Sequence, residues 1–360
     1  MSQFFMPVRI VEGENCIREN AELFSGLGRR ALIVTGKSSK TNGALDDAVF
    51  ALSSCGREYA VFDEIPQNPT LACVRAGGEA ARAFGADFVV AIGGGSPMDA
   101  AKAIAMLAVQ DVPDLFACEV KRVLPMVHVP TTAGTGSEVT QYSILTNDEK
   151  QTKTSISSPL FFPRLAFLDG RYLCGLPRAV TVNTAIDALS HAVEGMLSVR
   201  AGALSDALAR SAIAAILGEL EGLRTGELSA PSRADLLRAS TLAGMVIANT
   251  GTTPVHGMGY SLTYFAGIPH GRANGLLLPA FLEACLQKVP ERVRSIYSAL
   301  GTDANGFAEK MNALLGVRER FPAQTLADWA ERASHNKNIK NCSAHFEKED
   351  LLAVLKRSLL

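Results

Sequence analysis

The 360-residue sequence lacks the features that mark several classes of protein. Its formal net charge is −1 and it contains no run of lysine and arginine, which gives no electrostatic reason to expect nucleic acid as a partner. No stretch approaches the roughly 18 apolar residues of a membrane span, and no apolar segment follows a basic start at the N-terminus. We therefore expect a cytoplasmic protein that does not enter membranes.

Paired cysteines are also absent. The seven cysteines are scattered singly, without a CxxC pair, which argues against a disulfide framework or a zinc ribbon. The composition is that of a compact globular protein, with 48% hydrophobic and 20% charged residues. Because domains usually have roughly 100 to 200 residues, the length of the chain predicts two of them.

The first half of the sequence alternates short apolar runs with helical patterns. The runs are continuously apolar or β-branched, as expected of parallel strands that helices cover on both faces. This alternation predicts an α/β architecture with a Rossmann-like parallel sheet, whose ligands bind at the carboxyl ends of the strands. The four runs cover residues 31–35, 59–62, 87–92 and 124–130.

The second half has a different period. From about Pro177 the strand signals disappear, and segments such as 203–220 carry apolar residues at steps of three and four, which is typical of helices. No internal repeat or low-complexity linker marks a boundary. The change of period alone predicts an α/β domain over residues 1–176 and an all-helical domain over residues 177–360.

A glycine-rich turn, GGGSPMDAAKAIA, follows the third apolar run. Its glycines at 93–95 let a bound group approach the backbone closely. Ser96 is expected to cap the next helix, with Pro97 at the first helical position and Asp99 completing a capping pattern. The free N–H groups and the positive dipole at such a helix start favour a phosphate or pyrophosphate. The alternative is an ordinary tight turn between a strand and a helix.

A second polar turn follows the fourth apolar run, in LPMVHVPTTAGTGSEVT. Its threonines, serine and glycines offer hydroxyl groups and a flexible backbone to the same ligand. Two such turns at the ends of strands favour an extended dinucleotide.

Four side chains in the second half form a set that a divalent transition metal would choose. Asp187 and His191 are four residues apart in a helical pattern, so both lie on one face of the helix. His256 and His270 have a glycine and a proline between them and are expected to come from separate segments. One carboxylate with three imidazoles suits Fe(II), Zn(II), Mn(II) or Co(II). The alternative is that each histidine is a hydrogen-bonded interior residue.

These segments together resemble the iron-containing (group III) alcohol dehydrogenase family. The resemblance rests on GGGSPMDAAKAIA, VPTTAGTGSEVT, DALSHAVEGMLS, and HGMGYSL followed by GIPHGRANGLLLP, which occur in the family's order and span essentially the whole chain. It implies the two-domain architecture of dehydroquinate synthase-like proteins, with an N-terminal dinucleotide domain and an all-α C-terminal domain. It also implies that metal and nicotinamide meet in a cleft between these domains, and a homodimer would be ordinary for the family.

The resemblance assigns roles to residues by position. The family's metal ligands fall on Asp187, His191, His256 and His270. The positions on the cofactor side of the family's site fall on Asn68, Gly94, Gly95, Ser96, Asp99, Thr131, Thr132, Ile144, Lys153 and Leu176.

The end of the first apolar run bears on which nicotinamide cofactor is used. Relatives that prefer NAD(H) commonly carry an aspartate there, and this chain has Gly36. A carboxylate would repel a 2′-phosphate, whereas Gly36 followed by Lys37, Ser38, Ser39 and Lys40 offers room, donors and positive charge. We therefore expect NADP(H) to be preferred over NAD(H). The alternative is that these residues form only a solvated loop.

The expected reaction is hydride transfer between a small alcohol, diol or aldehyde and the nicotinamide, with Fe(II) polarising the substrate oxygen. Many family members carry a histidine four residues after the third metal ligand, where this chain has Tyr260. Tyr260 could donate a hydrogen bond or shape the pocket, and we favour the second role because a phenol is a poor base at neutral pH.

Three other functions remain open at this point. A zinc-dependent polyol dehydrogenase is possible because metal identity depends on supply and geometry as well as on ligand type. A dehydroquinate synthase-like lyase would need a dense set of basic residues for a phosphorylated substrate, and the motifs are poor in them. A non-catalytic nucleotide-binding module is the most remote.

Overall fold

The computed structural model of the protein describes residues 3–360 and divides into two compact units. The first, which we call the sheet unit, comprises Met6–Leu176 and Ser229–Thr241. The second, the helical unit, comprises Pro177–Leu228 and Leu242–Leu360, together with the N-terminal segment up to Phe5. In residues 3–360, no helix combines the length and the apolar character needed to cross a membrane.

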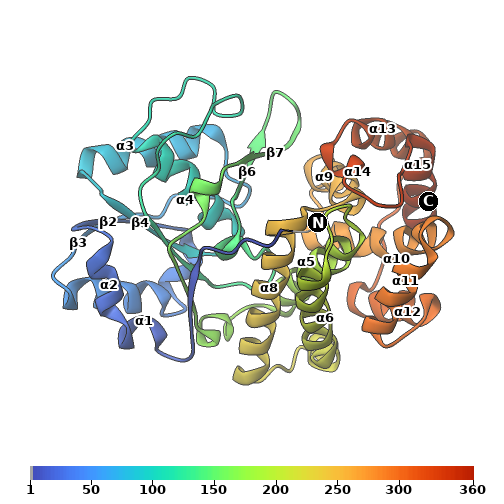
Figure 1. The fold of residues 1–360 in the computed structure, drawn as a ribbon, viewed down its shortest axis with the longest axis horizontal. Helices are drawn as coiled ribbons and strands as arrows, with labels where there is room; N and C mark the ends of the chain where they lie inside the picture. The colour runs from blue at the N-terminus through green and yellow to red at the C-terminus, as the bar shows by residue number, and fades with distance from the viewer. Residues whose placement is uncertain (1–2) are drawn as a thin grey trace. The chain divides into compact units, whose positions relative to one another are not determined.

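The sheet unit is built around a six-stranded parallel sheet with the order β1-β8-β5-β4-β2-β3 (Figure 1). Strands β2, β4, β5 and β8 are buried along nearly their whole length because they lie inside the sheet. A separate antiparallel pair joins β6 to β7. The strands are β1 (Arg9–Glu12), β2 (Arg30–Thr35), β3 (Glu58–Phe62), β4 (Phe88–Gly93), β5 (Met126–Pro130), β6 (Tyr142–Asn147), β7 (Thr152–Ser157) and β8 (Leu165–Leu168).

Helices cover both faces of this sheet. In Figure 1, α3 and α4 lie on one side of β2 and β4, and α1 and α2 lie on the other. Helix α4 is buried along almost its whole length, and its apolar side chains form a core with those of β2 and β4. The helices are α1 (Cys16–Glu19), α2 (Ala44–Ser54), α3 (Leu71–Phe84) and α4 (Gly95–Leu107).

The helical unit is formed by helices from Pro177 onward. Helix α10 is central to it and packs against α5, α9, α12 and α15. The first part of α8 is the exception, because it belongs to the sheet unit. The helices are α5 (Arg178–Leu197), α6 (Ala203–Gly218), α7 (Leu220–Thr225), α8 (Ala230–Thr250), α9 (Pro254–Ala266), α10 (His270–Lys288), α11 (Pro290–Leu300), α12 (Ala304–Leu315), α13 (Ala323–Ser334), α14 (Lys337–Lys340) and α15 (Lys348–Leu359).

The predicted fold class is confirmed. The four apolar runs become β2 to β5, and the second half of the chain supplies the helices, as its period indicated. The short strands β1 and β8 and the largely polar pair β6 and β7 were not predicted from the sequence.

The start of α4 differs from the prediction. The helix begins at Gly95, and Gly94, which is extended, is the residue before it. Ser96 is therefore inside the helix and does not cap it; its Oγ accepts a hydrogen bond from the backbone N–H of Asn68 at 3.3 Å. The glycines complete the turn earlier than the Ser-Pro pair suggests, and Pro97 is tolerated because N–H groups in the first helical turn need no partner within the helix.

Two glycines let α10 approach α5 unusually closely. A Cβ atom on Gly271 would lie 1.8 Å from the carbonyl oxygen of Asn183, and one on Gly275 would lie 2.6 Å from Cγ2 of Ile186. Only a hydrogen atom fits at either position. The absence of side chains on this face therefore sets the spacing between the two helices that carry Asp187 and His270.

Candidate metal and dinucleotide sites

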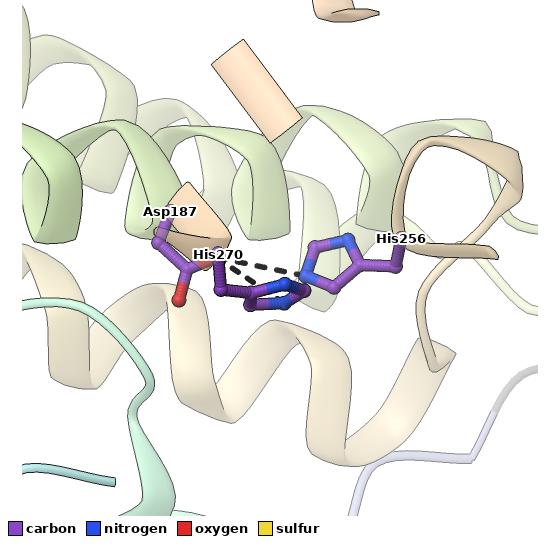
Figure 2. A group of neighbouring side chains, drawn as sticks. All are labelled: Asp187, His256 and His270. Atoms are coloured by element: carbon purple, nitrogen blue, oxygen red, sulfur yellow. Dashed lines mark ion pairs between the residues drawn. The ribbon is translucent and has the colours of Figure 1, made fainter. Parts of the chain in front are cut away.

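Three helices of the helical unit bring three of the predicted ligands together. Asp187 lies in the middle of α5, His256 in the first turn of α9, and His270 at the start of α10. Figure 2 shows their side chains pointing toward one another, and one ligand atom from each lies within 4.8 Å of the others. Oδ1 of Asp187 is 3.8 Å from Nε2 of His256 and 3.8 Å from Nε2 of His270.

Two of the distances in this cluster fit a shared divalent ion. Two atoms that bond one ion at roughly 2.1 Å can be at most roughly 4.2 Å apart, so the two distances of 3.8 Å fall within the limit. Asp187 and His256 are buried, and His270 is partly exposed. A carboxylate with imidazoles is a donor set that Fe(II) and Zn(II) both accept.

The other two residues predicted for this site lie beside the cluster. His191 is one helical turn after Asp187 on α5, and its ring stacks on that of His256 with 4.7 Å between the ring centres. Tyr260 lies one turn after His256 on α9, and its ring is nearly parallel to that of His270 at 5.7 Å.

Asn274, which was not predicted from the sequence, is buried in α10 one turn after His270. Its Nδ2 donates a hydrogen bond to Oδ1 of Asp187 at 2.9 Å. The same nitrogen lies 3.2 Å from Nε2 of His256 and 3.4 Å from Nε2 of His270. The spacing of four residues from His270 is the signal that could have identified it.

Glu194 was also missed. It lies on α5, three residues after His191 and seven after Asp187, and is fully buried. Its Oε2 accepts a hydrogen bond from Nδ1 of His256. Because residues three, four and seven apart share one helix face, the spacing in DALSHAVE already placed this carboxylate beside the predicted ligands.

In the sheet unit, the two glycine-rich turns lie against each other. A Cβ atom on Gly94 would lie 2.9 Å from Oγ1 of Thr132, and one on Gly95 would lie 2.6 Å from Cγ2 of Thr135. Gly93 has a φ of 147°, which favours glycine. Side chains are thus excluded where both turns meet.

The other predicted cofactor residues of the sheet unit lie at several places. Thr131 is buried, and its N–H donates to the carbonyl of Gly93 at 2.9 Å. Asn68 adopts a left-handed conformation, and its carbonyl accepts from the Thr146 hydroxyl at 3.1 Å. Lys153 on β7 pairs in register with Thr146 on β6. Leu176 is the last residue of the Met6–Leu176 segment of the sheet unit and lies two residues before α5.

Asp99 is held in a buried network. Its carboxylate accepts from the Ser137 hydroxyl at 2.5 Å and from the N–H of Ile144 at 3.2 Å. Nζ of Lys102 donates to the carbonyl of Ser137 and to that of Tyr142, both at 2.8 Å. Burial lowers the pKa of Lys102 to about 8, although Asp99 and Glu138 oppose the shift, and burial raises the pKa of Asp99. Through this network α4 holds the second turn in place.

Ser39 and Lys40, which follow β2, already form polar contacts within the protein. The Ser39 hydroxyl is buried and bonded to Thr35 and to the carbonyl of Gly36. Lys40 forms an ion pair with Asp63. The side chain of Ser38, a predicted cofactor contact, lies outside the described residues.

Comparison with known proteins assigns the chain to the oxidoreductases. The family described as iron-containing alcohol dehydrogenase matches residues 7–170, and the family's C-terminal part matches residues 181–359. The chain belongs to the iron-containing alcohol dehydrogenase family, and the resemblance seen in the sequence is confirmed.

Three relatives illustrate the similarity. Lactaldehyde reductase of Escherichia coli K12 is 36% identical over 286 residues, which cover 78% of this chain and 74% of that protein. An iron-containing alcohol dehydrogenase structure from Thermotoga maritima is 41% identical with a TM-score of 0.91, and covers 100% of this chain and 99% of its own. Sulfoacetaldehyde reductase from Bifidobacterium kashiwanohense, solved with NAD⁺, is 28% identical with a TM-score of 0.90, covering 99% and 98%.

Proposed function

We propose that the protein reduces short-chain aldehydes and oxidises the corresponding alcohols and diols, with NADP(H) as hydride carrier and Fe(II) at the metal site. The convergence of Asp187, His256 and His270 carries the proposal, because it offers a largely buried ion-binding site in a chain of this family. Two relatives are a lactaldehyde reductase and a sulfoacetaldehyde reductase. Both of these aldehydes carry a polar group on the carbon next to the carbonyl, which supports aldehydes of this kind as substrates.

The four proposed metal ligands are Asp187, His191, His256 and His270. A bound divalent ion would polarise the substrate oxygen and make the carbonyl carbon a better hydride acceptor. The ligands themselves orient the ion and adjust its charge, because an imidazole that binds through one nitrogen has no free lone pair for a substrate proton. Tyr260 is proposed to shape the pocket, which its nearly parallel stacking on His270 supports.

The dinucleotide is proposed to bind a domain over residues 1–176, with residues 177–360 forming the metal and substrate domain. The close contact of the two glycine-rich turns supports a pyrophosphate at the start of α4. The proposed contacts are Gly36, Ser38, Ser39, Asn68, Gly94, Gly95, Ser96, Asp99, Thr131, Thr132, Ile144, Lys153 and Leu176.

The preference for NADP(H) rests on Gly36. No carboxylate occupies this position, and the exposed Lys37 follows it. The relative solved with NAD⁺ shows that the other cofactor also occurs among similar proteins, so we propose a preference and not an exclusive use. We also propose a cytoplasmic homodimer. No specific observation favours a zinc-dependent polyol dehydrogenase, a lyase or a non-catalytic module.

The test is an assay of anaerobically purified, iron-loaded protein with a panel of aldehydes, ketones and diols, using NADPH and NADH on the same sample. We expect stoichiometric oxidation of NADPH with short aldehydes. A lyase would regenerate its cofactor in each cycle and consume none. No turnover with any carbonyl compound, despite full occupancy by metal and cofactor, would contradict the proposal.

A further inference from the structure

The carboxylate of Glu194 connects the start of α9 with a proposed metal ligand. Glu194 lies on α5 and is fully buried. Its Oε1 accepts hydrogen bonds from the N–H of Thr253 at 2.9 Å, from the Thr253 hydroxyl at 2.8 Å and from the N–H of Val255 at 3.1 Å. Its other oxygen, Oε2, accepts from Nδ1 of His256.

The contacts of Oε1 stabilise the first turn of α9. The N–H groups at the start of a helix have no partner within it, and the residue before α9, Thr253, forms no side-chain cap of its own. A carboxylate from α5 supplies that cap and also meets the positive end of the helix dipole. This role alone would make Glu194 a structural residue of α9.

The contact of Oε2 has a different consequence. A carboxylate only accepts hydrogen bonds, so Nδ1 of His256 carries the proton and Nε2 carries the lone pair of the ring. Nε2 is the atom that lies 3.8 Å from Oδ1 of Asp187. The amide nitrogen of Asn274, which can only donate, lies 3.2 Å from the same Nε2. The contacts at both ring nitrogens therefore indicate the same tautomer.

We propose that Glu194 is a positioning residue of the metal site, which holds the His256 ring so that its Nε2 lone pair is directed at the ion. The inference rests on the metal site of the proposed function. A carboxylate behind an imidazole fixes the ring of a metal ligand and raises its basicity. It also places negative charge next to a ligand at the positive end of α9, where a cation would otherwise be disfavoured.

Glu194→Gln separates the two roles of the side chain. If the amide oxygen faces α9, the NH2 group meets Nδ1 of His256 and stabilises the Nε2–H tautomer, which has no lone pair on the nitrogen that faces the metal site. If the amide is turned around, its NH2 group opposes the N–H groups of Thr253 and Val255. Two backbone donors against one ring nitrogen favour the first orientation. Thr253→Val is the matched control, because it removes one donor to Oε1 and leaves the contact with His256 intact.

The experiment measures three properties of wild-type protein and both variants. Zn²⁺ affinity is obtained by competition with a chromophoric chelator, the tautomer of His256 in the metal-free protein by ¹⁵N NMR, and stability by thermal denaturation. We expect Glu194→Gln to weaken Zn²⁺ binding by roughly 10–100-fold and to populate the Nε2–H tautomer. Thr253→Val is expected to lower the melting temperature while leaving the tautomer unchanged and the affinity close to that of the wild type.

Several results would overturn the inference. One is a Glu194→Gln protein with the Zn²⁺ affinity and the His256 tautomer of the wild type. Another is a loss of Zn²⁺ affinity in Thr253→Val as large as that in Glu194→Gln, which would make Glu194 only a helix cap. If Glu194→Gln does not fold, the wild-type spectrum decides, because a predominant Nε2–H tautomer there contradicts the assignment. If the wild type takes up no Zn²⁺ or Fe²⁺, the proposed function fails, whereas the tautomer still tests the role of Glu194.

Discussion

Replacing Gly271 with alanine tests whether the contact between α5 and α10 forms the metal site. The new Cβ would lie 1.8 Å from the carbonyl oxygen of Asn183 and 3.0 Å from Cβ of Asp187. Neither backbone segment can accept a contact that is more than 1 Å too short, so α10 must move. Overpacking of this kind costs about 1–3 kcal/mol, and a backbone clash belongs at the upper end of the range. The higher helix propensity of alanine returns only about 1 kcal/mol.

The same movement separates His270 from Asp187. Their ligand atoms are already 3.8 Å apart, close to the limit of roughly 4.2 Å for one shared ion. We therefore expect Gly271→Ala to lose about 2 kcal/mol in the free energy of unfolding by urea. We also expect metal affinity, measured by chelator competition, to fall by roughly tenfold or more.

The control is Gly218→Ala at the end of α6, where a Cβ would meet nothing within 4 Å. This variant should be as stable as the wild type or slightly more so. A Gly271→Ala protein with wild-type stability and metal affinity would refute the reasoning, because the close packing of α5 and α10 would then be unnecessary for the site.

Two further predictions concern pH and cofactor choice. Burial and the Lys102 ammonium hold the pKa of His128 well below its ordinary value of 6.5, so the unfolded chain binds a proton that the folded chain does not. The free energy of unfolding that this histidine contributes is fully present above about pH 6.5 and decreases below that pH by about 1.4 kcal/mol per pH unit. His128→Leu should remove this decrease, which urea denaturation of wild type and variant at pH 7.5 and 5.5 measures. An equal loss of stability at the lower pH in wild type and variant would contradict the prediction. Gly36→Asp should lower the ratio of kcat/KM for NADPH to kcat/KM for NADH, because a carboxylate repels a 2′-phosphate. The new Cβ would lie 3.2 Å from the carbonyl oxygen of Ile65, a contact that a small shift can relieve. An unchanged ratio would show that Gly36 does not select the cofactor.

The sheet was predictable where burial alone decides the residue type. Strands β2, β4 and β5 are buried inside the sheet, so their sequences are apolar throughout. Strand β1 was not predictable, because its partner β8 lies far along the chain and Arg9 pairs with Leu165 only in the folded protein. The pair β6 and β7 is rich in serine and threonine, and only alternate positions of β6 are buried.

The candidate metal site was predictable in its residue types but not in its geometry. The spacing of Asp187 and His191 on one helix is local and can be read from the sequence. That His256 and His270 approach the same point depends on how α9 and α10 pack, and glycines such as Gly271 determine this only in three dimensions. The role of Glu194 likewise depends on a neighbouring helix, although its position on the ligand face of α5 was visible beforehand.

The most direct test of the account is the dependence of aldehyde reduction on metal. The protein is purified anaerobically, stripped with a chelator, and titrated with Fe²⁺ while NADPH oxidation with a short aldehyde and bound metal are measured on the same samples. The account predicts no activity without metal and a linear gain that ends at one ion per chain. Full activity in the metal-free protein would contradict it.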